Sequence, residues 1–312
     1  KKYMNKKCLV TGGAGFIASH LVDKLIESGW RVAIVENLST GKKENLNKRA
    51  AFYKMDIQSS KVSDVFEREK PEIVFHYAAQ IDVRKSVENP TESAKTNILG
   101  SLNILENCKK LKVKKIVFAS TGGAIYGEAE VIPTPENYQG KPVSPYGIEK
   151  LIVEHYISFY KTEYGLDYLI LRFANVCGPR QNSKGEAGVI AIFCDKLLNG
   201  QELVINGSGE QTRDFVFVED IVRANFLGID KNKTGIFNVG TAKETNINAI
   251  FGKLAILFES KIKEVYAPPK PGEQERSCLD FQKINSELEW KPEYDLDGGL
   301  KITKEWFYKH KK

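Results

Sequence analysis

The feature that most constrains the fold of this chain is a glycine turn set between a short apolar run and a helical pattern. Residues 8–11 (Cys-Leu-Val-Thr) are rich in strand-forming types, and residues 12–19 (Gly-Gly-Ala-Gly-Phe-Ile-Ala-Ser) follow at once. Ile17, Leu21 and Leu25 then recur at the i+4 spacing of an amphipathic helix. A strand, a glycine turn and a helix in this order predict the first unit of a nucleotide-binding parallel sheet.

This unit also has the layout of a dinucleotide-binding site. A second strand, residues 31–35, ends in Glu36, which lies 24 residues beyond Gly12. Glycines let the backbone approach a pyrophosphate, the helix N-terminus favours its negative charge, and the acidic residue accepts hydrogen bonds from ribose hydroxyls. Because the Glu36 carboxylate would repel a 2′-phosphate, we expect NAD rather than NADP as the cofactor.

Further strand candidates alternate with helical segments along the first half of the chain. The strands are expected at residues 51–54, 73–76, 115–119 and 168–173, and the helices near residues 61–69 and 93–110. This alternation predicts a Rossmann-type, doubly wound parallel sheet, in which ligands bind off the carboxyl ends of the strands. The residues predicted to bind the cofactor are Gly12, Gly15, Phe16, Ile17, Glu36, Asn37, Asp56, Ile57, Tyr77, Ala78, Ala79, Gln80 and Asn97.

Tyr146 and Lys150 lie one helical turn apart, so a phenol and an ammonium can share one face of a helix. Ser144 can cap this helix and Pro145 fits its first position, which places Tyr146 in the first turn, at the ligand end of the sheet. A tyrosine pKa is about 10, and a neighbouring cation lowers it, so the pair is a candidate acid/base. The core face of the helix is predicted to consist of Ile148, Leu151, Ile152, His155, Tyr156 and Phe159.

The chain changes in texture after Asn175, where loops and short strands replace the regular alternation. Arg180, Arg213 and Arg276 fall on expected loops, and arginines in such positions suit phosphate binding. We therefore predict a Rossmann domain over residues 1–175, to which a segment near residues 210–240 returns. Residues 176–312 are predicted to form a smaller α/β domain that binds the substrate.

Bulk composition excludes several other classes of protein. The chain has 312 residues, 42% of them apolar, and no apolar run reaches the length of a membrane span. Its net charge of +6 is spread along the chain, so we expect no nucleic-acid partner. The five cysteines are scattered and no export signal is visible, so we expect no metal site and a cytoplasmic location.

Five segments together resemble the extended short-chain dehydrogenase/reductase family and, within it, the nucleotide-sugar epimerases. These segments are Thr11–Ile17, Glu36–Gly41, Ser144–Lys150, Arg172–Asn175 and Arg213–Phe215. The resemblance covers nearly all residues from Cys8 to Trp306. It implies a tightly bound NAD, a C-terminal domain that holds a nucleotide-diphosphate sugar, and a homodimer.

The closest resemblance is to the members that interconvert UDP-glucose and UDP-galactose. In the implied mechanism the Tyr146 phenolate removes the proton of the sugar 4-hydroxyl while hydride passes from C4 to NAD. The 4-keto sugar then turns over, and the hydride returns to its other face. Lys150 would also contact the nicotinamide ribose. Gly122 stands where the family usually has the Ser or Thr that holds the 4-hydroxyl, so we expect Thr121 in that role, with Ser120 behind it.

The resemblance also implies the residues that bind the nucleotide sugar, which are Asn175, Val189, Arg213, Glu273, Arg276 and Ser277. Ser277 is small at the position that resembles the family's gate for bulky 2-substituents, so epimerisation of UDP-N-acetylglucosamine is an alternative. Epimerisation of UDP-glucuronate is another alternative. A 4,6-dehydratase or decarboxylase is less favoured, because dehydratases have Asp-Glu where this chain has Gly123-Ala124. A non-catalytic NAD-binding regulator is disfavoured, because Tyr146 and Lys150 are both present.

Overall fold

The computed structural model describes residues 3, 5–184, 188–269 and 274–311. The chain divides into two compact units, each built from three segments. The first unit comprises Lys1–Thr121, Ser144–Arg172 and Asn225–Phe237, and the second comprises Gly122–Val143, Phe173–Ala224 and Asn238–Lys312.

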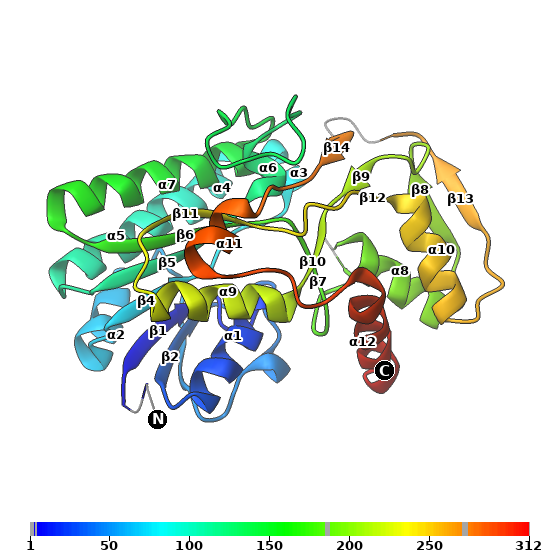
Figure 1. The fold of residues 1–312 in the computed structure, drawn as a ribbon. Coiled ribbons are helices and arrows are strands. Elements are labelled where there is room, and N and C mark those ends of the chain that lie inside the picture. The colour runs from blue at the N-terminus through cyan, green and yellow to red at the C-terminus, as the bar shows by residue number, and fades with distance from the viewer. Residues whose placement is uncertain (1–2, 4, 185–187, 270–273, 312) are drawn as a thin grey trace. The chain divides into compact units, whose positions relative to one another are not determined.

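The first unit is built on a seven-stranded sheet (Figure 1). Its strands are β1 (Lys7–Thr11), β2 (Arg31–Glu36), β3 (Ala51–Lys54), β4 (Ile73–His76), β5 (Lys115–Thr121), β6 (Asp167–Phe173) and β11 (Gly235–Val239). They lie in the order β11-β6-β5-β4-β1-β2-β3, and β1, β2, β3, β4 and β5 pair in parallel. The order reverses between β1 and β4, which is where sheets of this kind bind nucleotides. The predicted Rossmann-type fold is confirmed.

Helices cover both faces of this sheet (Figure 1). They are α1 (Phe16–Glu27), α2 (Val62–Glu69), α3 (Val83–Glu88), α4 (Pro90–Ala94), α5 (Gly100–Lys110), α7 (Pro145–Tyr164) and α9 (Val218–Asp230), with a 3-10 turn at Lys43–Asn45 and a π-helical turn, η2, at Lys95–Leu99. Helix α9 begins in the second unit and belongs to the first from Asn225 onward. One buried core joins Phe66 of α2, Ile104 of α5 and Ile157 of α7 to the sheet residues Leu9 and Phe118. The single helix predicted near 93–110 is therefore α4, η2 and α5 in succession.

The predicted core face of α7 is wrong. Ile148, Tyr156 and Phe159 are 45%, 38% and 49% exposed. The buried residues of this helix are instead Gly147, Glu149, Lys150, Val153, Glu154, Ile157 and Tyr160. The apolar pattern predicts that the charged residues of this helix face solvent. Glu149, Lys150 and Glu154 are instead buried, each beside a hydrogen-bonding partner.

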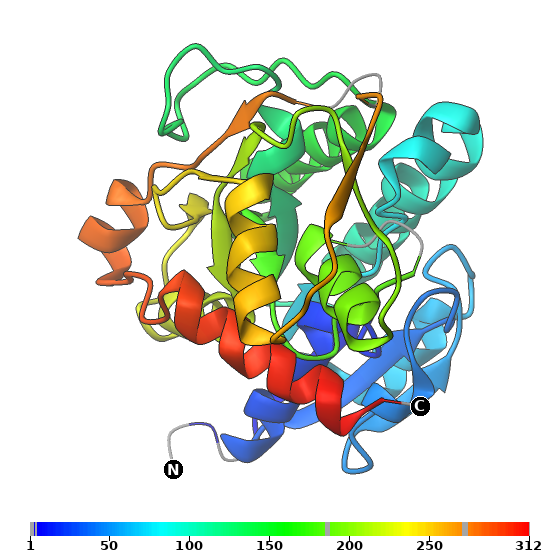
Figure 2. The same ribbon diagram turned by 90° about the vertical axis from the view of Figure 1, so that its right-hand side faces the viewer.

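The second unit combines short sheets with a helical layer. Its strands are β7 (Asn175–Cys177), β8 (Leu203–Asn206), β9 (Thr212–Arg213), β10 (Phe215–Phe217), β12 (Thr245–Asn246), β13 (Glu264–Ala267) and β14 (Arg276–Ser277), and its helices are α6 (Gly122–Ile125), α8 (Val189–Leu198), α10 (Ile247–Leu257), α11 (Gln282–Leu288) and α12 (Leu296–Lys309). The strands form the sheets β10-β7, β12-β9-β14 and β13-β8. Helices α8, α10 and α12 pack on one another (Figure 2), and Phe193 meets Phe251 edge to face between α8 and α10.

No helix within the described ranges is long and apolar enough to cross a membrane.

Candidate active site

The glycine turn after β1 packs directly against the loop that follows β4. Gly12 has φ +73°, and a Cβ added to it would lie 2.8 Å from the backbone N of Ala78. The backbone N–H groups of Tyr77 and Ala78 each donate to Thr11 Oγ1 over 3.1 Å. Helix α1 begins after Gly15, so no side chain caps its first N–H groups. A glycine-rich turn that leads into a helix N-terminus without a side-chain cap fits a pyrophosphate.

Acidic and amide side chains gather at the carboxyl ends of β2 and β3. Glu36 is buried, and its carboxylate accepts from the N–H of Leu38 over 2.6 Å and the N–H of Ala14 over 3.4 Å. Asn37 donates to Asp56 Oδ2 over 2.7 Å. This arrangement keeps a negative charge next to the glycine turn, where an adenosine ribose would lie, and it suits NAD.

Asn97 connects the loop after β4 to helix α7. Its Oδ1 accepts from the N–H of Gln80 over 2.8 Å, and its Nδ2 donates to Gln80 O over 2.9 Å and to Glu149 Oε2 over 2.6 Å. Asn97 lies within η2 and is buried. It therefore fixes the Gln80 backbone at the ligand end of the sheet.

His76 lies at the centre of a buried hydrogen-bond chain. Ser101 donates to Asn97 O over 2.5 Å, so its oxygen is free to accept from His76 Nε2, 2.8 Å away. Thr11 Oγ1 already accepts two backbone N–H groups, so it donates to His76 Nδ1 over 2.8 Å. Burial first, and the Lys150 charge second, lower the pKa of His76 to about 3. His76 is thus neutral at neutral pH, and its two ring nitrogens link β4 to Thr11 of β1 and Ser101 of α5 by hydrogen bonds. It does not serve there as an acid or a base.

Tyr146 and Lys150 lie on the buried side of α7, at the end of β5. The Ser144 side chain caps this helix by accepting from the N–H of Gly147 over 3.2 Å. Lys150 Nζ donates to Ala119 O over 2.8 Å and lies 5.9 Å from the centroid of the Tyr146 ring. Among the described residues, none is hydrogen-bonded to the Tyr146 hydroxyl. The phenol and the ammonium therefore face one region with their polar ends available.

Burial and charge act in opposite directions on these two groups. Burial raises the pKa of the Tyr146 phenol, and the Glu149 carboxylate raises it further. Burial lowers the pKa of Lys150 to about 8, while Glu154 and Glu149 act to raise it. Lys150 is therefore mostly protonated at neutral pH. The residues of the chain alone therefore keep Tyr146 as a neutral phenol. Ionising it to a phenolate would need a further positive charge beside it.

The three residues that end β5 and begin α6 have distinct environments. Ser120 is buried and donates to Glu154 Oε1 over 2.5 Å, so its hydroxyl is already engaged. Thr121 is partly exposed, and its hydroxyl has no hydrogen-bond partner in the described part of the chain. A Cβ at Gly122 would lie 2.5 Å from Leu279 Cδ1, so a side chain there would require Leu279 to move. Thr121 is the hydroxyl that the structure leaves available.

In the second unit, two of the predicted substrate arginines lie in one sheet. Arg213 on β9 pairs with Ser277 on β14, and Arg276 precedes Ser277. The loops expected at Arg213 and Arg276 are thus short strands. Arg276 forms a fork with Glu244, in which Nε donates to Oε1 over 2.9 Å and Nη2 donates to Oε2 over 2.6 Å. Arginine can make the same two-pronged contact to a phosphate group.

The other predicted substrate residues are more dispersed in sequence. The backbone N–H of Asn175 donates to Asp214 O over 2.9 Å, which joins β7 to the start of β10. Val189 is the first residue of α8. Glu273 lies outside the described residues.

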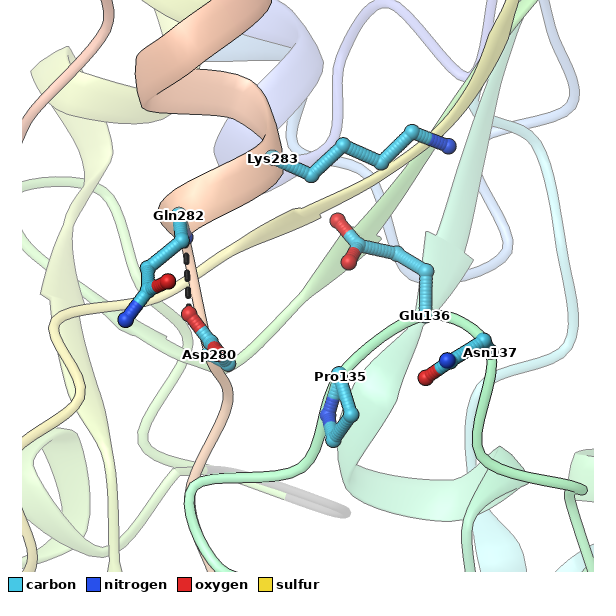
Figure 3. A pocket seen from close by; sticks show the side chains of 6 residues that line it. All are labelled: Pro135, Glu136, Asn137, Asp280, Gln282 and Lys283. Carbon is cyan, nitrogen blue, oxygen red and sulfur yellow. Dashed lines mark hydrogen bonds between the residues drawn. The ribbon is translucent and has the colours of Figure 1, made fainter.

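A separate hollow of about 400 Å³ lies in the second unit (Figure 3). It is lined by Pro135, Glu136, Asn137, Asp280, Gln282 and Lys283. Figure 3 shows Glu136 reaching into it from the loop and Lys283 from α11. Burial raises the pKa of Glu136, whose carboxylate accepts from the N–H of Asn238 over 2.7 Å. None of the predicted site residues lines this hollow.

Sequence reasoning missed the buried acids of α7. Glu149 accepts from Ser93 over 2.7 Å as well as from Asn97, and Glu154 pairs with Arg172. A signal for Glu154 was present in the sequence, because it lies four residues after Lys150 and therefore on the same helical face.

The sequence and the structure of this chain are both similar to those of known proteins. The model of the NAD dependent epimerase/dehydratase family matches residues 8–240. A protein of Methanocaldococcus jannaschii, described provisionally as a UDP-glucose 4-epimerase, is 48% identical over 96% of this chain and 97% of its own length. The crystal structure of UDP-glucose 4-epimerase from Thermotoga maritima with UDP-glucose has 50% identity and a TM-score of 0.96, covering 97% of this chain and 99% of that one. The UDP-glucose 4-epimerase of Thermus thermophilus in complex with NAD has 40% identity and a TM-score of 0.94, covering 97% and 99%.

Proposed function

The chain belongs to the NAD-dependent epimerase/dehydratase family, and from that premise we propose that it is a UDP-glucose 4-epimerase that interconverts UDP-glucose and UDP-galactose. The predicted family is confirmed, and with it an NAD-dependent enzyme. The observation that carries the proposal is the placement of Tyr146 and Lys150 at the end of β5, in the same unit as the glycine turn.

We propose that the first unit binds NAD. The glycine turn and the uncapped start of α1 hold the pyrophosphate, and Glu36, Asn37, Asp56 and Ile57 hold the adenosine half. The loop from Tyr77 to Gln80, whose Gln80 backbone is fixed by Asn97, would hold the nicotinamide half. Bound NAD would supply the hydride acceptor and donor for C4, and its nicotinamide ring would carry the further positive charge that a phenolate at Tyr146 needs.

Side chains of the first unit then transfer the proton of the sugar 4-hydroxyl. Tyr146 accepts the proton of the sugar 4-hydroxyl and returns it after the sugar has turned over. Lys150 stabilises the phenolate and binds the nicotinamide ribose, which is consistent with its making one hydrogen bond, to Ala119 O, among the residues that the structure describes. Thr121 donates to or accepts from the 4-hydroxyl, because Ser120 is engaged by Glu154 and Gly122 has no side chain.

We propose that the second unit binds the nucleotide diphosphate. Arg276 and Asn175 contact the diphosphate and Arg213 lies near it and the ribose, with Glu273 on the ribose hydroxyls. Val189 and Ser277 complete the set, and the small Ser277 side chain favours UDP-N-acetylglucosamine as a second substrate. Because the affinity then resides in the nucleotide, the hexose is free to present either face.

The direct test is incubation of purified protein with UDP-glucose in the absence of added cofactor. Formation of UDP-galactose is expected, whereas a 4-keto-6-deoxy product, or no product, would rule out the epimerase. Tyr146→Phe should lower kcat by about 10²–10⁴-fold and leave NAD bound. The same incubation with UDP-N-acetylglucosamine and UDP-glucuronate discriminates between the alternative substrates.

A homodimer is also proposed, because α7 carries a row of large apolar side chains on its outer face. Ile148, Tyr156 and Phe159 are exposed there, and such a row is typical of a protein interface. Phe159→Glu should convert a dimer to a monomer in light scattering, and Val265→Glu, at an exposed apolar residue on β13, is the matched control. A cytoplasmic location is proposed because all five cysteines are buried free thiols.

A further inference from the structure

Glu154 is a buried carboxylate one helical turn beyond Lys150. Tyr146, Lys150 and Glu154 follow one another at i+4 spacing along α7, so they share one face. Glu154 is 3% exposed and Arg172, on the neighbouring strand β6, is 6% exposed. Glu154 therefore brings a full negative charge into the interior beside the proposed catalytic ammonium.

Both oxygens of Glu154 are already occupied by other donors. Arg172 Nε lies 3.0 Å from Oε1 and 3.2 Å from Oε2, and Arg172 Nη2 donates to Oε2 over 2.6 Å. Ser120 donates to Oε1 over 2.5 Å. The carboxylate is thus held by a planar fork from β6 and a hydroxyl from β5, and it makes no ion pair with Lys150 in the described structure.

Within the described ranges Lys150 makes one hydrogen bond, to Ala119 O. It is 4% exposed, and an ammonium has three N–H groups. The titratable and charged groups that face it are Tyr146, Glu149 and Glu154 on α7, His76 on β4, and Arg172 beyond Glu154 on β6. His76 is neutral, so the two carboxylates are the counter-charges that favour the ammonium.

We propose that Glu154 is a positioning residue whose charge keeps Lys150 protonated, and that Arg172 and Ser120 hold Glu154 so that it cannot capture the ammonium. A carboxylate free to rotate would form a buried ion pair with Lys150 and withdraw its N–H groups from Tyr146. The Arg172 fork prevents this, because a bidentate guanidinium fixes both carboxylate oxygens. The charge of Glu154 then acts through space, while the hydrogen bonds of Lys150 remain available to the site.

Two variants should shift the titration of Lys150 in opposite directions. Glu154→Gln removes the counter-charge and should move the alkaline limb of the kcat profile down by about 1 pH unit. Arg172→Met releases Glu154 to pair with Lys150, which should move the limb up by about 1 pH unit and lower kcat. A purely structural role would reduce activity without opposite shifts.

Each single variant removes one member of the buried Glu154–Arg172 ion pair and keeps the charge of the other, so a variant that neutralises both is included. Glu154→Gln/Arg172→Met removes both charges and should show the downward shift of Glu154→Gln. The matched control is Arg223→Met in the second unit, which leaves the fully buried Asp220 without its arginine. It should lower stability and leave the alkaline limb in place.

Only the activity measurements rest on the proposed function. A second readout compares each protein with its Lys150→Met counterpart and follows the difference in unfolding free energy against pH. The midpoint of that difference reports the titration of Lys150 without any turnover. A midpoint that moves down in Glu154→Gln supports the role of Glu154 even if no epimerase activity exists. An unchanged midpoint in both Glu154→Gln and the double variant would overturn the inference.

Discussion

Replacing Lys150 by methionine should increase the stability of the protein near neutral pH and lose that advantage at high pH. The folded chain lowers the pKa of Lys150 from 10.5 to about 8, mainly by burial. The unfolded chain therefore holds this proton more tightly than the folded chain does. Below about pH 8 the burial of the charge opposes folding, by about 3 kcal/mol at about 1.4 kcal/mol per pKa unit.

The sign of the pH dependence follows from the proton count. Between pH 8 and 10.5 the unfolded state binds more protons at this site than the folded state, so the free energy of unfolding rises with pH. Lys150→Met removes this dependence. It also removes the donor to Ala119 O, which subtracts a roughly constant 1 kcal/mol or so from the variant. The variant should be about 2 kcal/mol more stable at pH 7, and the order should reverse by about pH 10.

Urea unfolding of both proteins at pH 7, 8, 9 and 10 measures this directly. The quantity of interest is the difference between the two free energies at each pH, because groups that titrate alike in both proteins cancel. The wild-type protein should gain roughly 2–3 kcal/mol on the variant across this range. A difference that does not vary with pH would show that Lys150 titrates at its ordinary value and would refute the reasoning.

Three further substitutions test other parts of the two units. Gly12→Ala places a Cβ 2.8 Å from Ala78 N at φ +73°, so we expect loss of bound NAD, measured in the nucleotide extracted from purified protein, with the circular dichroism spectrum retained. Gly122→Ser meets Leu279 at 2.5 Å and should lower stability by about 1–3 kcal/mol in urea, with partial recovery in Gly122→Ser/Leu279→Ala. Glu244→Gln releases the Arg276 fork, and because the Arg276 side chain is more than half exposed we expect UDP binding by calorimetry to tighten by only about two- to fivefold. Unchanged affinity would indicate that Arg276 does not bind the diphosphate.

Most of the fold of the first unit could be predicted, because the patterns that indicate its strands and helices lie in short, continuous segments of sequence. Strand, glycine turn and helix follow one another between residues 8 and 25, and alternation repeats along the sheet. The strand-end rule then identifies residues such as Gly12 and Glu36 without knowledge of long-range contacts.

The second unit was less predictable because its elements are short and its contacts are distant in sequence. Strands β9 and β14 have two residues each, too few for any periodicity to show. A side chain at position 122 would clash with the side chain of Leu279, which is 157 residues away in the sequence. No local pattern encodes that contact.

Helix α7 shows why an apolar pattern can point to the wrong face. Buried charges are tolerated only where each has partners, and the partners of Glu149, Lys150 and Glu154 come from η2, β5 and β6. Those elements are far apart in sequence, so the charges look like solvent-facing residues until the fold is known. Because the charged residues take the buried face of α7, the apolar residues Ile148, Tyr156 and Phe159 lie on its outer face. In the proposed dimer a second copy of the chain would cover them. The proposed dimer would thus link assembly to chemistry through one helix, since the orientation of α7 that buries Lys150 also exposes Ile148, Tyr156 and Phe159.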